Sequence, residues 1–322
     1  MAKDRVAVVA GGSAGVGRAV VSALLDKGYK VAVCARGEER LAAMREEIGA
    51  ERLLATSVDV ADAAAMEGFA KEVVETLGVP SVWVNSAMLT AFSPFREMPP
   101  EEFEQIVAAT FMGQVNGTRA ALRVMERGRI VNIGSGLAYR PVPFQSAYCA
   151  AKHAINGFTG SIASELMREK SGVSLALVQL PAVNTPQFTW ARNRMKKKPQ
   201  PAPPIYTPEL AAKAVMKAAE GDAREIFVGK SVMQLVFGTM VLPAWLDKKL
   251  AEDGVETQKS DEAEPGDRED NLETPAEHPA TADGRFGDRA SSDGWIVDAD
   301  LARKVVFFGV PALAFLLGLV IG

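Results

Sequence analysis

The chain has 322 residues, of which 48% are apolar and 24% are charged, a composition that excludes a chain disordered throughout. Its net charge is −4, and its two cysteines and two histidines exclude a disulfide framework and a zinc site of the usual Cys/His spacing. Only His153 and His278 could serve a Ser-His-Asp or Cys-His mechanism, so we expect a catalyst in this chain to use other groups.

Short apolar runs alternate with helical patterns over the first 230 residues. Runs rich in Val and Ile, and apolar on both faces, predict strands at residues 6–10, 31–35, 54–58, 82–85, 129–133, 173–180 and 225–228. The segments between them have helical spacing, for instance residues 16–27, which Gly28 closes as a C-cap. Strands buried on both faces and separated by helices predict an α/β fold with a doubly wound parallel sheet of about seven strands.

Three later segments depart from this pattern. Residues 186–206 contain Phe188, Trp190, five basic residues and five prolines, and they predict a mobile loop in which Lys196, Lys197 and Lys198 are solvated. Residues 231–246 are too short and mixed to span a membrane, and they predict an interfacial or dimer-contact helix or one packed in the core. Residues 251–300 hold 16 acidic and four basic residues, a net charge of −12, whereas residues 1–250 carry +6. This contrast predicts a folded domain over 1–250 followed by a disordered acidic linker over 251–300.

Residues 305–322 carry no charge, and Arg303 and Lys304 precede them. As a helix these 18 residues would be about 27 Å long, close to the ~30 Å hydrocarbon core of a bilayer. We therefore expect residues 301–322 to form an apolar C-terminal helix that anchors the protein to a membrane, with the body in the cytoplasm. The start of the chain has no apolar region typical of a secretory signal. The alternative is a soluble protein whose C-terminal helix docks on an oligomer interface.

A glycine-rich turn follows the first predicted strand. The sequence AGGSAGVG places glycines at Gly11, Gly15 and Gly17, and a helix follows at once. Glycines let the backbone approach a pyrophosphate closely, and the helix N-terminus offers amide donors to it. A purely structural turn is the alternative, but the strand–turn–helix setting favours dinucleotide binding.

The end of the second predicted strand, VAVCARGEERL, contains no acidic residue that could bind a ribose 2′-hydroxyl. Arg36 stands there instead, and a guanidinium can pair with a 2′-phosphate. A solvated arginine is the alternative. The missing acid favours NADP(H).

Tyr148 and Lys152 form the most specific local pattern, with Ser135 thirteen residues before the tyrosine. Residues at i and i+4 share one face of a helix, so the ammonium can lie near the phenol and lower its pKa toward the working pH. Such a pair is most often two surface residues. Its position after the fifth strand of a chain with a dinucleotide motif favours a catalytic acid or base.

Taken in order, these motifs resemble the short-chain dehydrogenase/reductase family over about residues 4–230. The matching motifs are the GxxxGxG turn, VDV at 58–60, VNSA at 84–87, IGSG at 133–136 and YCAAK at 148–152. The resemblance implies a Rossmann-like fold. It also implies that Tyr148 exchanges a proton with the substrate oxygen, that Lys152 binds the nicotinamide ribose, and that Ser135 orients the carbonyl.

The same resemblance implies a set of cofactor contacts. Asp59 would meet the adenine edge, Asn85 and Ala87 would lie beside the cofactor, and Val183 and Thr185 would hold the nicotinamide amide. The full implied set is Gly11, Ser13, Gly15, Val16, Gly17, Arg36, Asp59, Val60, Asn85, Ala87, Tyr148, Lys152, Val183 and Thr185.

Three positions depart from the family pattern. Thr110 replaces an asparagine whose backbone carbonyl holds a proton-relaying water, Met88 replaces a glycine near the nicotinamide, and Leu180-Pro181 precedes Ala182 where Pro-Gly is usual. We interpret these changes as adjusting the activity and not as abolishing it, because Ser135, Tyr148 and Lys152 are all present. We therefore keep Thr110 among the predicted catalytic residues.

The sequence thus predicts a membrane-tethered, NADP(H)-dependent oxidoreductase that interconverts a carbonyl and a hydroxyl on an apolar small molecule. We expect a homodimer or homotetramer and no nucleic-acid partner. The alternative is a non-catalytic NADP-binding or membrane-tethered scaffold protein, which Thr110 and Met88 would motivate.

Overall fold

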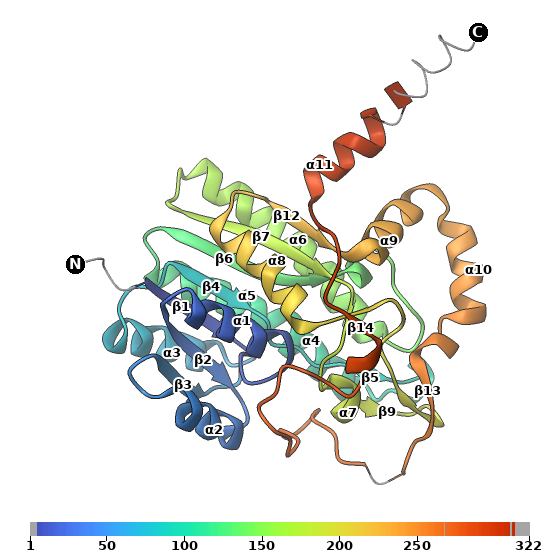
Figure 1. The fold of residues 1–322 in the computed structure, drawn as a ribbon, viewed down its shortest axis with the longest axis horizontal. Coiled ribbons are helices and arrows are strands. Elements are labelled where there is room, and N and C mark those ends of the chain that lie inside the picture. Colours follow the sequence, from blue (N-terminus) through green and yellow to red (C-terminus); the bar gives the residue numbers. More distant parts are fainter. Residues whose placement is uncertain (1–4, 267, 310, 313–322) are drawn as a thin grey trace.

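The computed structural model describes residues 5–266, 268–309 and 311–312. A central eight-stranded sheet has the order β15-β12-β7-β6-β4-β1-β2-β3, and its strands are parallel except for β15, which pairs antiparallel with β12 (Figure 1). These strands are β1 (Arg5–Ala10), β2 (Tyr29–Ala35), β3 (Leu53–Ser57), β4 (Val82–Asn85), β6 (Gly128–Ser135), β7 (Val173–Leu180), β12 (Glu225–Val228) and β15 (Ile296–Asp298).

The seven predicted strands are confirmed, because each apolar run supplies side chains to both faces of the sheet. In β1, Ala7 and Val9 are buried in the hydrophobic cluster on one face, and Val6 and Val8 in the cluster on the other. The eighth strand, β15, was not predicted. Its three residues follow an acidic stretch and form too short a run to give a periodic signal.

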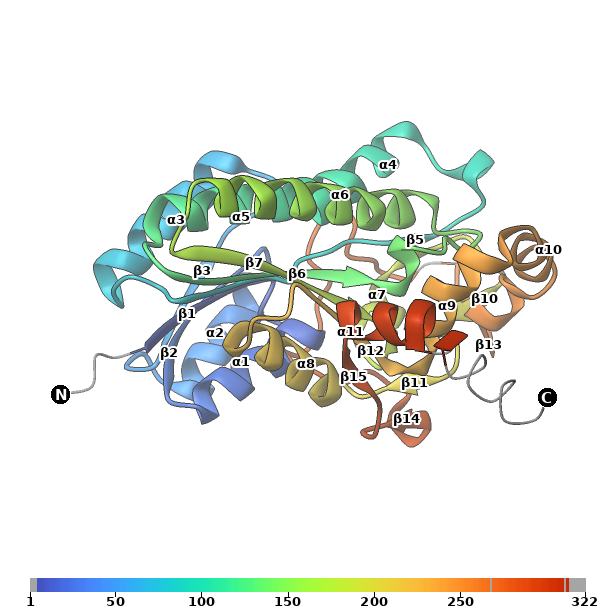
Figure 2. The ribbon, with the colours of Figure 1, turned by 90° about the horizontal axis from the view of Figure 1, so that it is seen from above.

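Helices cover both faces of the sheet (Figure 2). One face carries α1 (Gly15–Asp26), α2 (Glu38–Ile48) and α8 (Pro208–Glu220), and the other carries α3 (Ala63–Thr76), α5 (Gly113–Val124) and α6 (Ser146–Arg168). Helix α4 (Pro100–Val107) continues through a single π-helical turn, η2 (Ala108–Met112), into α5. This arrangement leaves the carboxyl ends of the strands as the edge at which a ligand site can form.

Residues 186–206, expected to be a mobile loop, are folded. They contain α7 (Gln187–Trp190) and the short strands β9 (Arg192–Asn193), β10 (Lys197–Pro199) and β11 (Ile205–Tyr206), which pair with β5 (Ala91–Phe92), β13 (Lys259–Ala263), β8 (Ala182–Val183) and β14 (Ala290–Ser291). Phe188 packs against the rings of Phe92 and Phe286. The prediction failed because these partners are distant in sequence.

The expectation of a disordered linker over 251–300 is wrong for the part of it that the structure describes. The segment supplies β13, β14 and β15 together with the short turns η4 (Glu256–Gln258) and η5 (Gly287–Arg289). Leu272 is fully buried and Phe286 nearly so. The average composition of these 50 residues does not reveal the few apolar residues that are buried. Acidic residues of the segment also form ion pairs with basic residues of the body, as Asp270 does with Arg192.

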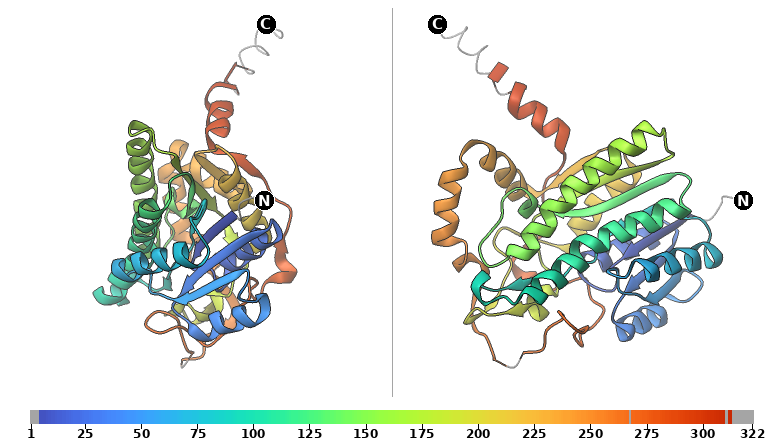
Figure 3. Two further views of the ribbon diagram at one scale, coloured as in Figure 1. Left: turned by 90° about the vertical axis from the view of Figure 1, so that its left-hand side faces the viewer. Right: turned by 180° about the vertical axis from the view of Figure 1, so that it is seen from behind.

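The C-terminal helices lie at one corner of the molecule. Residues 231–246 fall in two helices, α9 (Gly229–Val241) and α10 (Pro243–Asp253); Val232 and Val236 are buried, whereas Val241 and Trp245 are exposed. Helix α11 (Ala299–Lys304) leads away from the body and continues as the π-helical turn η6 (Val305–Gly309) (Figure 3).

Within the described residues we find no helix with the length and apolar character needed to cross a bilayer. The apolar helix expected from the tail sequence is therefore not observed. Half of the expected helix over 301–322, namely residue 310 and residues 313–322, lies outside the described residues.

Candidate active site

The glycine-rich turn between β1 and α1 is packed too closely to admit side chains. A Cβ on Gly11, whose φ is +85°, would lie 2.5 Å from the backbone nitrogen of Ala87, and a Cβ on Gly17 would lie 2.1 Å from the carbonyl oxygen of Gly11. The tight turn places the N-terminus of α1 at the carboxyl edge of the sheet. In the part of the chain that the structure describes, no side chain caps this helix end.

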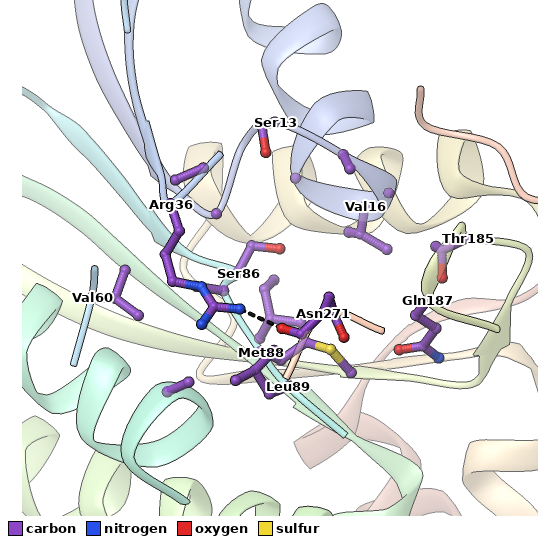
Figure 4. Close-up of a pocket in the computed structure, with 18 of the residues that line it drawn as sticks. Ser13, Val16, Arg36, Val60, Ser86, Met88, Leu89, Thr185, Gln187 and Asn271 are labelled. Carbon is purple, nitrogen blue, oxygen red and sulfur yellow. Dashed lines mark hydrogen bonds between the residues drawn. The ribbon is translucent and has the colours of Figure 1, made fainter. Parts of the chain in front are cut away.

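One cavity opens at this edge, and it gathers most of the residues predicted as a site (Figure 4). The predicted residues that line it are Gly11, Ser13, Gly15, Val16, Gly17, Arg36, Asp59, Val60, Ala87, Tyr148, Lys152 and Thr185. They come from the turns after β1, β2, β3 and β4, from α6, and from the segment after β8. The cavity thus runs from the glycine-rich turn to the tyrosine and lysine of the YxxxK motif.

Arg36 lies just after β2 and directs its guanidinium into the cavity (Figure 4). The guanidinium donates hydrogen bonds to the carbonyl oxygens of Asn271, of Leu272 at 3.1 Å and of Glu273 at 3.3 Å. Burial lowers the pKa of Arg36, and the nearby Asp59 carboxylate opposes that shift. The group stays a cation, because the pKa of an arginine begins far above neutrality.

Tyr148 and Lys152 lie in the first two turns of α6, as their spacing predicts. The Lys152 Nζ is 5.5 Å from the centroid of the Tyr148 ring and donates to the carbonyl oxygen of Ile133 at 2.7 Å. Lys152 is 1% exposed, and its burial lowers its pKa to about 7. Burial raises the pKa of Tyr148, while its hydrogen bond with Ser135 opposes the shift. The expected lowering of the tyrosine pKa is therefore not observed, because burial dominates.

Ser135 and Thr110 do not line the cavity wall. The Ser135 hydroxyl accepts a hydrogen bond from the Leu137 amide at 3.1 Å. Thr110 lies in the π-helical turn η2, where its hydroxyl accepts from the Leu89 amide and donates to the Leu89 carbonyl, both at 3.0 Å. The threonine side chain thus fixes the loop after β4, and its neighbour Ala109 lines the cavity.

Asn85 and Val183 are placed elsewhere. Asn85 is 1% exposed; its side chain accepts from the Trp83 indole at 3.0 Å and donates to Asn132 at 2.8 Å. This buried network joins β4 to β6. Val183 is buried in β8, where it pairs with Tyr206.

Several cavity residues were not in the predicted set. They are Ala14, Ala35, Arg40, Val58, Ser86, Met88, Leu89, Ala109, Ile133, Gly134, Leu180, Pro186, Gln187, Trp190 and Asn271. Arg40 could have been found, since it lies four residues after Arg36, in the first turn of α2. Asn271 could not have been found, because nothing in the local sequence of the acidic segment indicates that this segment lies beside the cavity.

A sequence profile of the short chain dehydrogenase family matches residues 5–196. The chain therefore belongs to this family, and it is an oxidoreductase of short-chain dehydrogenase type with the Rossmann-like sheet described above.

Two curated relatives and one solved structure illustrate the similarity. An uncharacterized oxidoreductase, YxnA, from Bacillus subtilis is 28% identical over 99% of this chain and 89% of its own. The NADPH-dependent pterin aldehyde reductase of Arabidopsis thaliana is 31% identical over 58% of this chain and 77% of its own. The alcohol dehydrogenase of Thermococcus sibiricus, solved with 5-hydroxy-NADP, is 26% identical with a TM-score of 0.60, over 69% of this chain and 95% of its own.

Proposed function

We propose that the protein is an NADP(H)-dependent oxidoreductase that interconverts a carbonyl and a hydroxyl on a small, apolar molecule. The observation that carries this proposal is that one cavity holds both the anion-binding groups, which are the glycine-rich turn and Arg36, and a proton-transfer pair, Tyr148 and Lys152. A scaffold protein that only bound a nucleotide would not need the second group.

The residues that line the cavity suit the phosphates of a phosphorylated dinucleotide. The N-terminus of α1, which no described side chain caps, has backbone amides that can donate to a pyrophosphate, and the close packing of Gly11 on Ala87 leaves no space for a side chain in the turn before it. Arg36 and Arg40, which both line the cavity, supply positive charge for a 2′-phosphate. Two relatives support the choice of NADP(H), since one is named as NADPH-dependent and the other was solved with an NADP derivative.

Tyr148 is the proton donor in the proposed reduction. Burial keeps its phenol protonated at neutral pH, so the hydroxyl can transfer a proton to the carbonyl oxygen of the substrate. When bound, NADPH supplies the hydride that completes the reduction. Ser135 lies outside the cavity lining and acts through its hydrogen bond with the phenol, and Lys152 lies near the ring. Oxidation of an alcohol reverses these roles.

The surroundings of Tyr148 favour an apolar substrate. The tyrosine packs against a buried cluster that includes Leu89, Ile106 and Ala109, with Phe103 at its edge. A charged substrate group placed there would lose its hydration without gaining a partner.

A screen of aliphatic and aromatic aldehydes and ketones, followed by the loss of NADPH absorbance, tests this proposal. We expect turnover with apolar carbonyl compounds and none with their carboxylate analogues. The non-catalytic alternative is correct if the protein binds NADPH but none of the carbonyl compounds tested makes it oxidise NADPH, and none of the alcohols tested makes it reduce NADP.

We also propose that the tail beginning at residue 305 anchors the protein to a membrane, with the catalytic domain on the cytoplasmic side. The support is the charge-free sequence of 305–322, the basic pair Arg303 and Lys304 before it, and the exposure of Phe307 and Phe308 at 47% and 73%. Deletion of residues 305–322 should abolish co-sedimentation with phospholipid vesicles and leave NADPH binding unchanged. Equal sedimentation of both chains would contradict the anchor. The homodimer or homotetramer stays a prediction.

A further inference from the structure

Residues 268–284, which we name the strap, pass along the edge of the cavity on their way from β13 to β14: Asn271 lines it, and further strap residues contact Arg36, Arg40 and Gly15. The strap is held at its start by Asp270, whose carboxylate is 2.7 Å from the Arg192 Nε, and by the Asn271 amide, which donates to the Trp190 carbonyl oxygen at 2.9 Å. It is held at its end by the Gly284 amide, which donates to the Asn184 carbonyl oxygen at 3.2 Å. Both attachments are to the segment between β7 and α8.

The strap occupies the donors that an anionic ligand would use. Its carbonyl oxygens at residues 271–273 accept from Arg36, and that of Ala276 accepts from Arg40 at 2.6 Å. The carbonyl oxygen of Thr281 accepts from the Gly15 amide at 2.9 Å, at the N-terminus of α1. A carbonyl oxygen and a phosphate oxygen are both acceptors, and a donor hydrogen in use by one is lost to the other.

The strap also places an apolar side chain beside the proposed catalytic tyrosine. Leu272 is fully buried in the cluster that contains Leu89, Ile106 and Ala109 and that Tyr148 borders. The Gln105 side chain donates to the Leu272 carbonyl oxygen at 2.7 Å. Leu272 therefore anchors the first part of the strap in the cluster behind Tyr148.

The size of the cavity and the charge of the strap also indicate that the strap lies where a dinucleotide would bind. The cavity beneath the strap holds about 210 Å³, whereas pockets for drug-sized ligands hold roughly 300–1,000 Å³, and a dinucleotide is larger than such ligands. The strap has five acidic residues and one basic residue, Arg268, so it brings negative charge to a site whose wall contains Arg36 and Arg40. Like the cofactor, the strap is negatively charged, and it lies against the same basic residues.

We propose that the strap is an intramolecular competitor of the dinucleotide: it must leave Arg36, Arg40 and the Gly15 amide before the cofactor's phosphates can bind there. This inference rests on the proposed NADP(H) dependence. The apparent affinity for NADPH is then the intrinsic affinity reduced by the fraction of molecules with the strap released. Any change that releases the strap raises that affinity.

The test measures NADPH binding by titration calorimetry to the full-length protein and to two variants that loosen the strap. Leu272→Ser removes the buried anchor, and Asp270→Asn weakens the ion pair with Arg192. We expect the dissociation constant to fall by about tenfold for Leu272→Ser and by a smaller factor for Asp270→Asn. Thr274→Ala, at an exposed position of the same strap, is the matched control and should not change it.

Hydrogen exchange of the unmodified protein provides a second reading that needs no substitution. We expect saturating NADPH to increase amide exchange over residues 268–284 and to slow it over residues 11–17. Slower exchange over both regions would overturn the inference, because the strap would then close over the bound cofactor. Unchanged affinity in both strap variants would overturn it as well, while leaving the NADP(H) proposal intact. Absence of NADPH binding to all four chains would overturn the NADP(H) proposal and the competition with it.

Discussion

Lys152 donates a hydrogen bond from its Nζ to the main-chain carbonyl oxygen of Ile133, 2.7 Å away, near the carboxyl end of β6. The contact ties the amine of the YxxxK motif to the central sheet and keeps the side chain almost completely buried. Burial lowers the pKa of Lys152 to about 7, so the lysine changes charge near neutrality. Burial of the Lys152 ammonium therefore lowers the free energy of unfolding of the protein.

The first prediction concerns this cost. The ordinary pKa of a lysine is 10.5, and in the folded chain that of Lys152 is about 7. Between these values the unfolded chain binds more protons than the folded chain. The loss in free energy of unfolding caused by burying the charged amine is therefore complete below pH 7, and it disappears as the pH rises to 10.5. Lys152→Met should raise the free energy of unfolding at low pH by a few kcal/mol, at about 1.4 kcal/mol for each pKa unit, and the gain should vanish in alkali.

Urea denaturation of the cofactor-free protein across this pH range measures the effect. Lys71→Met, which removes an exposed ammonium from α3, is the control. A Lys152→Met protein that is no more stable than the parent in mild acid would contradict a lysine pKa lowered by burial.

The sheet and the core of the site were predictable because their signals are local. Each strand is a single apolar run, and Gly11, Arg36 and Tyr148 each belong to a short motif next to a predicted strand or helix. The strap was not predictable, because its order depends on pairs such as Asp270 with Arg192, which are 78 residues apart. Asn85 shows a different limit. Its motif position predicts a cofactor contact, whereas its hydrogen bonds with Trp83 and Asn132 inside the fold could not be read from the sequence.

The second prediction tests that buried network. A Cβ on Gly117 would lie 2.0 Å from the Asn85 Oδ1, so Gly117→Ala must displace the amide that joins Trp83 to Asn132. We expect the free energy of unfolding to fall by about 1–3 kcal/mol, the cost of leaving a buried polar group unsatisfied. Gly68→Ala in α3 is the matched control: its Cβ meets no atom within 4 Å, and it should stabilise the helix by roughly 0.5–1 kcal/mol. Equal effects in the two unfolding curves would mean that the network adds nothing.

The third prediction concerns cofactor choice. Arg36→Ala should weaken NADPH binding by about 1.5–3 kcal/mol more than NADH binding, because a charge-assisted hydrogen bond to the 2′-phosphate is lost. The comparison uses the ratio of the two dissociation constants, since release of the strap acts on both cofactors alike. Arg36→Lys, which keeps the charge but loses the planar fork, should give an intermediate ratio. The same ratio in all three proteins would show that Arg36 does not read the phosphate.

The central claim is that Tyr148 transfers the proton in an NADPH-linked carbonyl reduction. Tyr148→Phe removes the hydroxyl and leaves the ring in its apolar cluster. Tyr29→Phe removes a hydroxyl from the opposite end of the sheet, at the start of β2, and serves as the control. The decisive measurement is the turnover number of the three proteins with the best carbonyl substrate, together with the dissociation constant for NADPH. We predict that Tyr148→Phe loses all but a few per cent of turnover with its NADPH affinity nearly unchanged, while Tyr29→Phe keeps both. Substantial turnover in Tyr148→Phe would contradict the account.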